Sequence, residues 1–299
     1  MNARLTRCMR ATLVACALSP AMVAAAERLL VISSSDKGPY QQAQGGIQKA
    51  FPAAEMLQAS GDDDAAVART VARLPRDAAI VTLGRSASTL VANAGISASV
   101  VNCMVIAGID AHPGAPLVVP LEIPQEMQIA WLKRLLPNAH NVGILFDPAQ
   151  NERRVADGAA AWKRAGFVTV LEPVAGPAAL PSALTRLTNS VDVLHAIPDT
   201  TVFAPEHSRA LLLFSFRHQI PLAGPSEAWV RAGALYAIDW DYADLGRYCA
   251  ALAVRQAGGA KSPPPPPART RVVVNARSAE QLRIKWDDET RRSFDKVYE

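Results

Sequence analysis

The chain has 299 residues, with 31 Lys and Arg against 27 Asp and Glu, a formal net charge of +4, and 50% hydrophobic residues. Residues 1–26 hold three Arg and no acidic residue, so the formal charge of the remainder falls to +1. A remainder so close to neutral excludes the basic footprint of a nucleic-acid-binding protein, and its length suits one large domain or two lobes.

The N-terminus has the features of a secretory signal peptide. Arg4, Arg7 and Arg10 precede an uncharged run of apolar and small residues that ends in three alanines. A positive head, a short apolar centre and a small-residue exit are typical of such signals. A membrane anchor would instead need about 20 predominantly apolar residues. We therefore predict a cleaved signal peptide over residues 1–26 and a periplasmic location.

A second processing pattern lies inside this segment. Leu13 to Cys16 fits the four-residue pattern of lipoprotein processing, which would leave Cys16 as an acylated N-terminus. Only five residues separate Arg10 from Cys16. This is shorter than the roughly 7–15 apolar residues of a typical signal. A lipid anchor at Cys16 is therefore the secondary prediction.

After residue 26 the chain alternates short apolar runs with segments of helical length. Strands are predicted at residues 29–32, 78–83, 100–109, 142–146, 167–170, 191–196, 220–223 and 270–275. Helices are predicted at 39–51, 86–94, 124–136 and 152–165, and the charged tail 278–299 as one or two solvated helices. This alternation is typical of parallel sheets covered by helices on both faces.

Two features favour two lobes over a single sheet. A stretch at 110–120 with Pro and Gly interrupts the alternation, and five consecutive prolines follow Ser262. A polyproline run is a stiff spacer rather than part of a sheet. We therefore expect a divided α/β chain.

Cys103 and Cys249 are the two cysteines beyond residue 26. An oxidising compartment permits a disulfide, but bridging requires Cα atoms within about 7 Å of each other. Two buried thiols are the preferred expectation, with a disulfide as the alternative. The sequence has no CxxC, HExxH or Cys/His cluster, so neither a metal site nor a cofactor is predicted.

Four predicted strands end in polar residues suited to a small ligand. In open α/β sheets, ligands bind at the carboxyl ends of the strands. The helix that begins after Gly84 has free N–H groups at its N-terminus, which favour a carboxylate or phosphate. Strand ends that are followed by an acidic side chain suit an ammonium group instead. The candidate ligand-binding residues at these exits are Ser34, Ser35, Tyr40, Arg85, Ser86, Ser88, Asp147, Asp199 and Thr200.

Each exit also has a structural alternative. Ser86 and Asp199 are residue types favoured as helix N-caps without any ligand. Asp147 followed by Pro148 fits a cap with a proline at the first helical position. Any one of these residues is more often a helix cap than a ligand contact. The prediction of a binding site therefore rests on polar residues following four strands together.

The sequence does not predict an enzyme. It has no GxSxG, P-loop or GxGxxG motif, and its five histidines are scattered. His195 lies in an apolar strand run and is expected to be a satisfied core residue. Asp239 and Asp241 form a close carboxylate pair, which is weak evidence for acid–base chemistry.

The chain resembles the ABC-transporter substrate-binding proteins of the tryptophan/tyrosine type from about Leu29 to Ala279. The segments that carry the resemblance are Leu135–Ala139, Val142–Leu145, Ile197–Asp199, Val230–Leu235, Asp241–Arg247 and Val273–Asn275, followed by Ala279. The order and spacing of these segments make the resemblance fairly specific.

This resemblance implies two Rossmann-like lobes of the type I periplasmic-binding-protein kind, hinged by crossing segments near 121–122, near 237–238 and near the polyproline run. Lobe I is then expected at 27–121 plus 238–262, and lobe II at 122–237 plus 268–299. Both cysteines would fall in the first lobe, which strengthens the case for a disulfide.

The resemblance also implies roles for individual residues. Ser86 and Ser88 stand where the family holds a ligand carboxylate, and Asp199 where it has an acidic partner for an amino group. Asp241 matches the aspartate of the family's DYxxLG segment. Asp147 departs from the asparagine of amino-acid binders, and Arg85 replaces a residue that is more often small. An added arginine suits a more acidic or larger ligand.

The predicted function is that of an exported solute-binding protein. It would capture a small organic ligand, amino-acid-like or another carboxylate, between its lobes and deliver it to a membrane ABC permease. It is expected to act as a monomer, without a cofactor and without nucleic acid. The alternatives are a ligand sensor that docks on a membrane receptor or kinase, and an exported enzyme that uses the same cleft.

Overall fold

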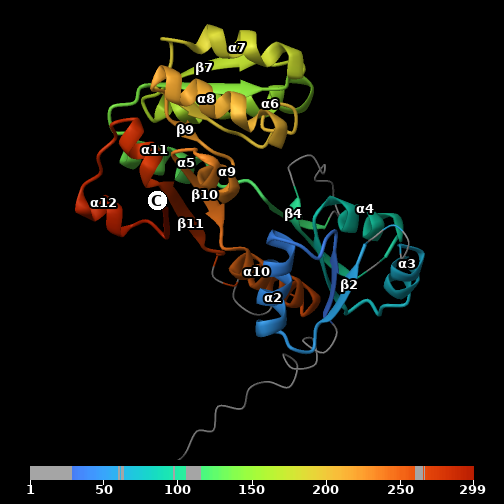
Figure 1. Ribbon diagram of the computed structural model, residues 1–299. Coiled ribbons are helices and arrows are strands. Elements are labelled where there is room, and N and C mark those ends of the chain that lie inside the picture. Colours follow the sequence, from blue (N-terminus) through green and yellow to red (C-terminus); the bar gives the residue numbers. More distant parts are fainter. Residues whose placement is uncertain are drawn as a thin grey trace, which may run out of the picture.

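The computed structural model describes residues 29–59, 61, 64–96, 98–105, 116–259, 265 and 267–299. The predicted signal peptide, the acylation site Cys16, the segment 106–115 and most of the polyproline run lie outside the described residues. The described chain forms two α/β lobes, one above the other in Figure 1.

Lobe I contains a five-stranded parallel sheet in the order β2-β1-β3-β4-β5. Its strands are β1 (Leu29–Ser33), β2 (Glu55–Gln58), β3 (Ala79–Leu83), β4 (Ser99–Val105) and β5 (Leu117–Pro120). Its helices are α2 (Pro39–Ala50), α3 (Asp64–Ala72), α4 (Arg85–Asn93) and α10 (Tyr242–Ala257). We use the name lobe I for residues 29–120 and 242–257.

Every residue of β1 and β3 is buried, because helices cover both faces of this sheet. Leu29 and Val31 pack with α2 and α10. Leu30 and Ile32 pack with α3 and α4 on the opposite face. A strand buried on both faces is a continuous apolar run, which is why these strands are evident in the sequence.

Lobe II, residues 125–240 and 270–299, contains a seven-stranded sheet in the order β12-β11-β10-β9-β8-β6-β7. The strands are β6 (Asn141–Phe146), β7 (Val168–Pro173), β8 (Val193–His195), β9 (Leu222–Ala223), β10 (Tyr236–Trp240), β11 (Thr270–Asn275) and β12 (Lys296–Tyr298). The helices are α5 (Gln125–Leu135), α6 (Pro148–Arg164), α7 (Leu180–Leu187), α8 (Ser208–His218), α9 (Glu227–Ala232), α11 (Ala276–Gln281) and α12 (Asp288–Arg292). Two 3-10 turns, η1 (Pro177–Ala179) and η2 (Pro205–His207), complete it.

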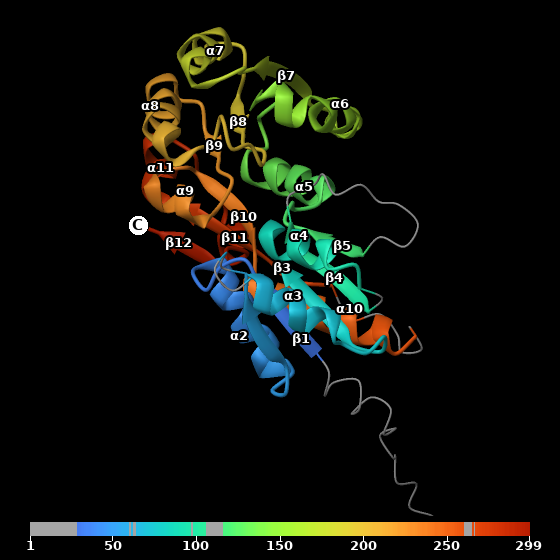
Figure 2. The same cartoon turned by 90° about the vertical axis from the view of Figure 1, so that its right-hand side faces the viewer.

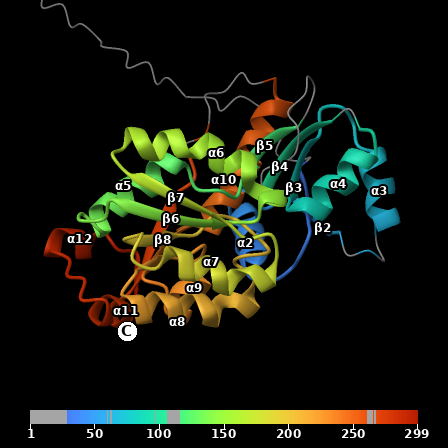
Figure 3. The same cartoon turned by 90° about the horizontal axis from the view of Figure 1, so that it is seen from above.

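The lobe II sheet is also covered on both faces (Figure 3). Helices α5, α6 and α11 pack on one face around Trp162 and Leu135. Helices α7, α8 and α9 pack on the other around Leu187 and Leu211. Among the described residues, no helix has the length and apolar character needed to traverse a lipid bilayer.

The predicted α/β fold of two lobes with parallel sheets is confirmed, with one exception in strand direction. Strand β11 runs antiparallel to β10. Strand β10 leads out of lobe II into α10 of lobe I, and the chain then returns from lobe I into β11. Strand β10 runs toward the junction between the lobes, whereas β11 starts at the junction and runs away from it. The two neighbouring strands are therefore antiparallel.

The structure refines two expectations about the C-terminal part. We expect the second crossing near Ala237–Ile238; strand β10 stays hydrogen-bonded to β11 as far as Trp240, and α10 of lobe I begins at Tyr242. The tail is expected to be mostly one or two solvated helices; it does contain α11 and α12, but β12 pairs with β11 and Trp286 packs against the core. An unpaired edge at β11 would expose its backbone polar groups, and β12 covers that edge.

The expectation of two buried thiols is wrong. Cys103 on β4 and Cys249 on α10 form a disulfide across 146 residues, with their Cα atoms 6.3 Å apart. The structure therefore confirms the alternative expectation, a disulfide between these two cysteines. The contact exists because α10 lies on the lobe I sheet rather than in lobe II.

Helix α10 packs closely on α2, and two glycines permit it (Figure 1). A Cβ atom built on Gly46 would lie 1.9 Å from the carbonyl oxygen of Ala243. A Cβ atom on Gly246 would lie 2.2 Å from the carbonyl oxygen of Ala43. The two helix backbones therefore touch at both points, and only glycine fits there.

We predict that Gly46→Ala destabilises the protein by about 1–3 kcal/mol or more, because the added methyl group forces α2 away from the backbone of α10. The control is Gly45→Ala in the same helix, where a Cβ atom meets nothing within 4 Å. It should instead stabilise the protein by up to about 1 kcal/mol through helix propensity. Denaturant unfolding measures both. Equal effects of the two variants would contradict the close-packing argument.

Candidate functional site

The carboxyl ends of the parallel strands in the two lobes face each other. Strand β5 ends at Pro120, and the chain then passes through 121–124 into lobe II. Strand β10 ends at Trp240 and leads directly into α10 of lobe I. The strands that leave each lobe point toward the other lobe, so the carboxyl edges of the two sheets meet at the junction (Figure 2). In open α/β sheets this is the edge where ligands bind.

A cavity of about 240 Å³ lies at this junction. The crossing segment contributes Leu121, Glu122 and Ile123, and Tyr242 contributes from the start of α10. The carboxyl ends of β8, β9 and β10 form the rest of the wall, with Gln128 from α5. The cavity is therefore lined by lobe II, by the first crossing segment and by the first turn of a lobe I helix.

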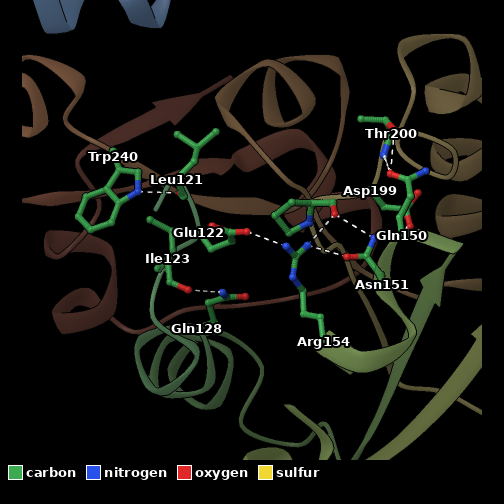
Figure 4. A network of polar contacts seen from close by, with 11 residues as sticks. Leu121, Glu122, Ile123, Gln128, Gln150, Asn151, Arg154, Asp199, Thr200 and Trp240 are labelled. Carbon is green, nitrogen blue, oxygen red and sulfur yellow. Dashed lines mark hydrogen bonds and ion pairs between the residues drawn. The ribbon is translucent and has the colours of Figure 1, made fainter. Parts of the chain in front are cut away.

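The crossing segment is held in place by a polar network (Figure 4). The indole Nε1 of Trp240 donates to the carbonyl oxygen of Leu121 at 2.8 Å, and Gln128 Nε2 donates to that of Ile123 at 2.6 Å. Arg154 pairs with Glu122 at 2.8 Å and also donates to the carbonyl oxygen of Pro198. Three successive residues are thus fastened to lobe II, which gives the cavity a defined wall.

Asp239 and Tyr242 organise the side of the cavity nearest lobe I. The Tyr242 hydroxyl donates to Asp239 Oδ1 at 2.6 Å, and Asp239 Oδ2 accepts from the backbone N–H of Glu227 at 3.2 Å. Burial, together with the Asp239 charge, raises the pKa of Tyr242 above its ordinary value. Tyr242 therefore stays protonated and keeps donating to the carboxylate.

Ser34 and Tyr40 meet at the start of α4. The Ser34 hydroxyl accepts from the backbone N–H of Ala87 at 3.0 Å. A Cβ atom on Gly84 would lie 2.8 Å from both Ser34 Oγ and the Tyr40 ring, and Gly84 has a φ of +88°. Glycine is needed here for its conformation and for this close approach.

The other predicted ligand-binding residues of lobe I differ in exposure and in hydrogen-bond partners. Arg85 and Ser86 are exposed in the first turn of α4, beside Ser34 and Tyr40 in space. Ser88 is buried and donates to the carbonyl oxygen of Gly84 at 2.9 Å. Ser35 shapes its own loop, because its hydroxyl accepts from the N–H of Lys37. None of the six predicted lobe I residues lines the junction cavity.

The predicted acidic residues of lobe II form one internal cluster. Asp199 Oδ2 accepts from Asp147 N at 2.7 Å and from Asn151 Nδ2 at 2.8 Å. Its Oδ1 accepts from the backbone N–H groups of Thr201 and Val202 at 2.9 and 2.8 Å. Four donors fill the lone pairs of this carboxylate, so it holds two loops together.

Asp147 caps α6, accepting from Ala149 N at 2.9 Å. Hydrogen bonds from Thr201, and also from Ala149 and Gln150, hold the pKa of Asp147 below its usual range, against the opposing effect of burial. Thr200 donates to Gln150 Oε1 at 2.8 Å. These side chains shape the ends of β6 and β8.

Asp241 lies on the second crossing. It caps α10 by accepting from Asp244 N at 3.1 Å, and its other oxygen pairs with Arg269 at 3.2 Å. Arg269 directly precedes β11, so Asp241 ties two crossing segments to each other. It does not line the cavity.

Several residues that line the cavity were not among the candidate ligand contacts chosen from the sequence. Ser226 follows Gly224 and Pro225 at the exit of β9, and Asp239 lies at the end of β10. The strand-exit argument applied to residues 220–223 would have found Ser226. Among the described residues, no group of three or more His, Cys, Asp or Glu side chains is placed to hold a metal ion.

The expectation that His195 is a satisfied core residue is wrong in one respect. His195 is buried, but its Nδ1 has no hydrogen-bond partner within the described part of the chain. Burial lowers the pKa of His195 to about 4. Its imidazole is therefore neutral at neutral pH. Both His195 and Tyr236, whose hydroxyl also lacks a partner there, line the cavity.

Two lobes with parallel sheets, crossed by the chain at a ligand-sized cavity, define the class of type I periplasmic binding proteins. The sequence model of the ABC transporter substrate binding protein family matches residues 46–297. This chain belongs to that family. No curated protein sequence is significantly similar to it.

Solved structures share the fold at low sequence identity. A domain in complex with L-Trp from Streptococcus pneumonia is 20% identical, with a TM-score of 0.60 over 90% of this chain and 99% of that one. A ligand-free, open substrate binding protein with adhesive properties from Clostridium difficile is 16% identical, with a TM-score of 0.72 over 90% and 98%. A 5-methylthioribose transporter solute binding protein from Thermotoga lettingae is 15% identical, with a TM-score of 0.52 over 84% and 86%.

We predict that His195 makes stability depend on pH between about 4 and 6.5. The unfolded imidazole binds a proton below about 6.5 but the folded one only below about 4, so stability falls as the pH is lowered through this range. The loss attributable to this group is of order 3 kcal/mol. His195→Phe should remove it, whereas His140→Phe, at an exposed site, should not. Denaturant titrations at several pH values provide the measurement, and an unchanged pH dependence in His195→Phe would contradict the assignment.

Proposed function

We propose that this protein is an exported solute-binding protein that captures a small organic ligand in the junction cavity and delivers it to a membrane permease. The observation that carries the proposal is the cavity itself, lined by lobe II, by a crossing segment and by Tyr242 of α10. Closure of hinged lobes around a ligand is a known binding motion. Capture of this kind needs no covalent step, and we assign none.

Among the predicted ligands, the acidic side chains around the cavity favour an amino-acid-like ligand over a carboxylate without an amino group, because an amino acid carries an ammonium group. The described residues that line it include Glu122 and Asp239 but neither Lys nor Arg. A ligand amino group would therefore lie toward Asp239, whose Oδ2 accepts one hydrogen bond in the structure and has room for a second. The carboxylate would lie toward lobe I, where Arg85, Ser86 and the N-terminus of α4 offer donors.

We assign Asp199 a different role from the one that the family resemblance implies. Its carboxylate already accepts four hydrogen bonds from lobe II. We propose that Asp199 positions the ends of β6 and β8, and that Asp239 takes the part of the acidic ligand contact.

The location and partner follow from the same proposal. A protein that feeds an ABC permease must reach the outer side of the membrane, and the predicted signal peptide over residues 1–26 provides that route. We propose a periplasmic protein that acts as a monomer.

A thermal-shift screen of residues 27–299 tests the proposal. The panel contains amino acids, aromatic acids, purines and small carboxylates. A ligand present at 100 times its Kd should stabilise the folded protein by about 2.7 kcal/mol, which raises the melting temperature. The absence of any shift across the panel would count against capture of a ligand of these classes.

We predict that Asp239→Asn weakens binding of the ligand found in this screen by about 1–3 kcal/mol, because a charge-assisted hydrogen bond is lost. The matched variant Asp199→Asn should act mainly on stability, since it replaces a buried carboxylate that accepts four hydrogen bonds. Calorimetric titration and thermal unfolding separate the two effects. Weaker binding by Asp199→Asn at unchanged stability would restore Asp199 as the ligand contact.

A further inference from the structure

A row of three residues crosses the lobe II sheet at the inner end of the cavity. In the strand register, His195 on β8 is paired with Ala223 on β9, and Ala223 is paired with Tyr236 on β10. Paired residues of neighbouring parallel strands point to the same face of the sheet, and the strands are about 4.8 Å apart. Two large polar side chains therefore flank a single methyl group, and all three residues line the cavity.

Two polar atoms of this row lack hydrogen-bond partners in the described part of the chain. His195 is 7% exposed and Tyr236 2% exposed. Within the described residues, neither His195 Nδ1 nor the Tyr236 hydroxyl has a hydrogen-bond partner. A buried polar group without a partner costs free energy, and native proteins seldom leave one unexplained. Two such atoms belong to residues that line one cavity, which indicates that a group from outside the described chain completes their hydrogen bonds.

The surroundings of the row do not offer that partner. Trp162 of α6 packs edge-on against the His195 ring, with 5.0 Å between ring centroids. Val193 and Val274 lie in the same apolar cluster as Tyr236. On the cavity side, Ala196 and Ile238 are apolar as well. All three residues of the row line the cavity, so a ligand held there is the partner considered for these two atoms.

We infer that His195, Ala223 and Tyr236 form a subsite for an uncharged hydroxyl group of the ligand, at the end remote from its charged groups. The inference rests on the proposed function. A neutral imidazole nitrogen and a phenol can each donate or accept, and a hydroxyl group does both. Ala223 leaves the space in which that group would lie between the two rings.

Electrostatics favour an uncharged group over an ion at this subsite. Because burial lowers the pKa of His195 to about 4, the imidazole carries no charge that would attract an anion near neutral pH. Burial also raises the pKa of Tyr236, so its hydroxyl keeps its proton. The ligand would then place its charged end toward Asp239 and lobe I, and its hydroxyl between the rings.

The experiment uses matched pairs of probes that differ by one hydroxyl group: 4-hydroxyphenylacetate and phenylacetate, L-threonine and L-2-aminobutyrate, and L-tyrosine and L-phenylalanine. Calorimetric titration measures the ratio of the two Kd values within each pair. The variants are Tyr236→Phe, which removes only the hydroxyl, and His195→Phe, which replaces the imidazole by an aromatic ring without hydrogen-bonding atoms. Tyr248→Phe is the control, because Tyr248 packs against the lobe I core.

For the pair that fits the cavity, the wild-type protein should bind the hydroxylated member about tenfold more tightly or better. Each variant should reduce that ratio toward one by weakening binding of the hydroxylated member alone. The control should keep the wild-type ratio. An unchanged ratio in both variants, or no discrimination by the wild-type protein, would overturn the subsite.

A second measurement needs no ligand. If the Tyr236 hydroxyl lacks a partner in the unliganded protein, Tyr236→Phe should melt at the wild-type temperature or higher. A clear drop, larger than that of Tyr248→Phe, would mean that the hydroxyl is already satisfied, by bound water for example, and would overturn the inference.

The two proposals fail in different ways. A wild-type protein that binds another member of the screening panel but neither member of any probe pair overturns the hydroxyl subsite and leaves the proposed function standing. A protein that binds nothing in the panel contradicts both.

Discussion

The structure depends on one helix packing, that of α10 on α2. Helix α10 lies in the sequence between two strands of lobe II, yet it belongs to lobe I, where Gly46 and Gly246 let the two helix backbones touch. The Cys103–Cys249 disulfide fastens the same helix to β4. Because α10 returns to lobe I, the chain passes between the lobes after β5, after β10 and again before β11. These passages hold the two lobes with their ligand-binding edges facing each other.

The direction of the strands follows from these passages and places the cavity. Strands β8, β9 and β10 run toward lobe I, so their carboxyl ends meet the first crossing segment, which Trp240 and Arg154 hold against lobe II. Strand β11 enters beside β10 in the opposite direction. The cavity therefore lies where both lobes can contribute, and hinge closure would change the distance between its walls. Under the proposed function, a ligand bound in this cavity would link its capture to the relative position of the lobes.

Sequence reasoning about strand exits named residues that the structure brings together in pairs, but it did not separate helix caps from candidate ligand contacts. Ser34 and Tyr40 do meet at the start of α4, and Asp147 and Asp199 do lie together at the ends of β6 and β8. The Asp199 carboxylate, however, accepts hydrogen bonds from backbone N–H groups of its own lobe. A strand exit is also a helix start, and the same residue types serve as caps and as ligand contacts. The local sequence cannot separate these roles, because the difference lies in which donors the fold brings near.

By itself the sequence determined the α/β class, most strands of both sheets and the family, because buried strands are continuous apolar runs and the family segments keep their order along the chain. Only the tertiary structure decided the antiparallel β11, the disulfide and the row of His195, Ala223 and Tyr236. The physical reason is the same in each case. Which strand lies beside which, and in what register, depends on contacts between segments far apart in the chain, and periodicity within one segment carries no information about them.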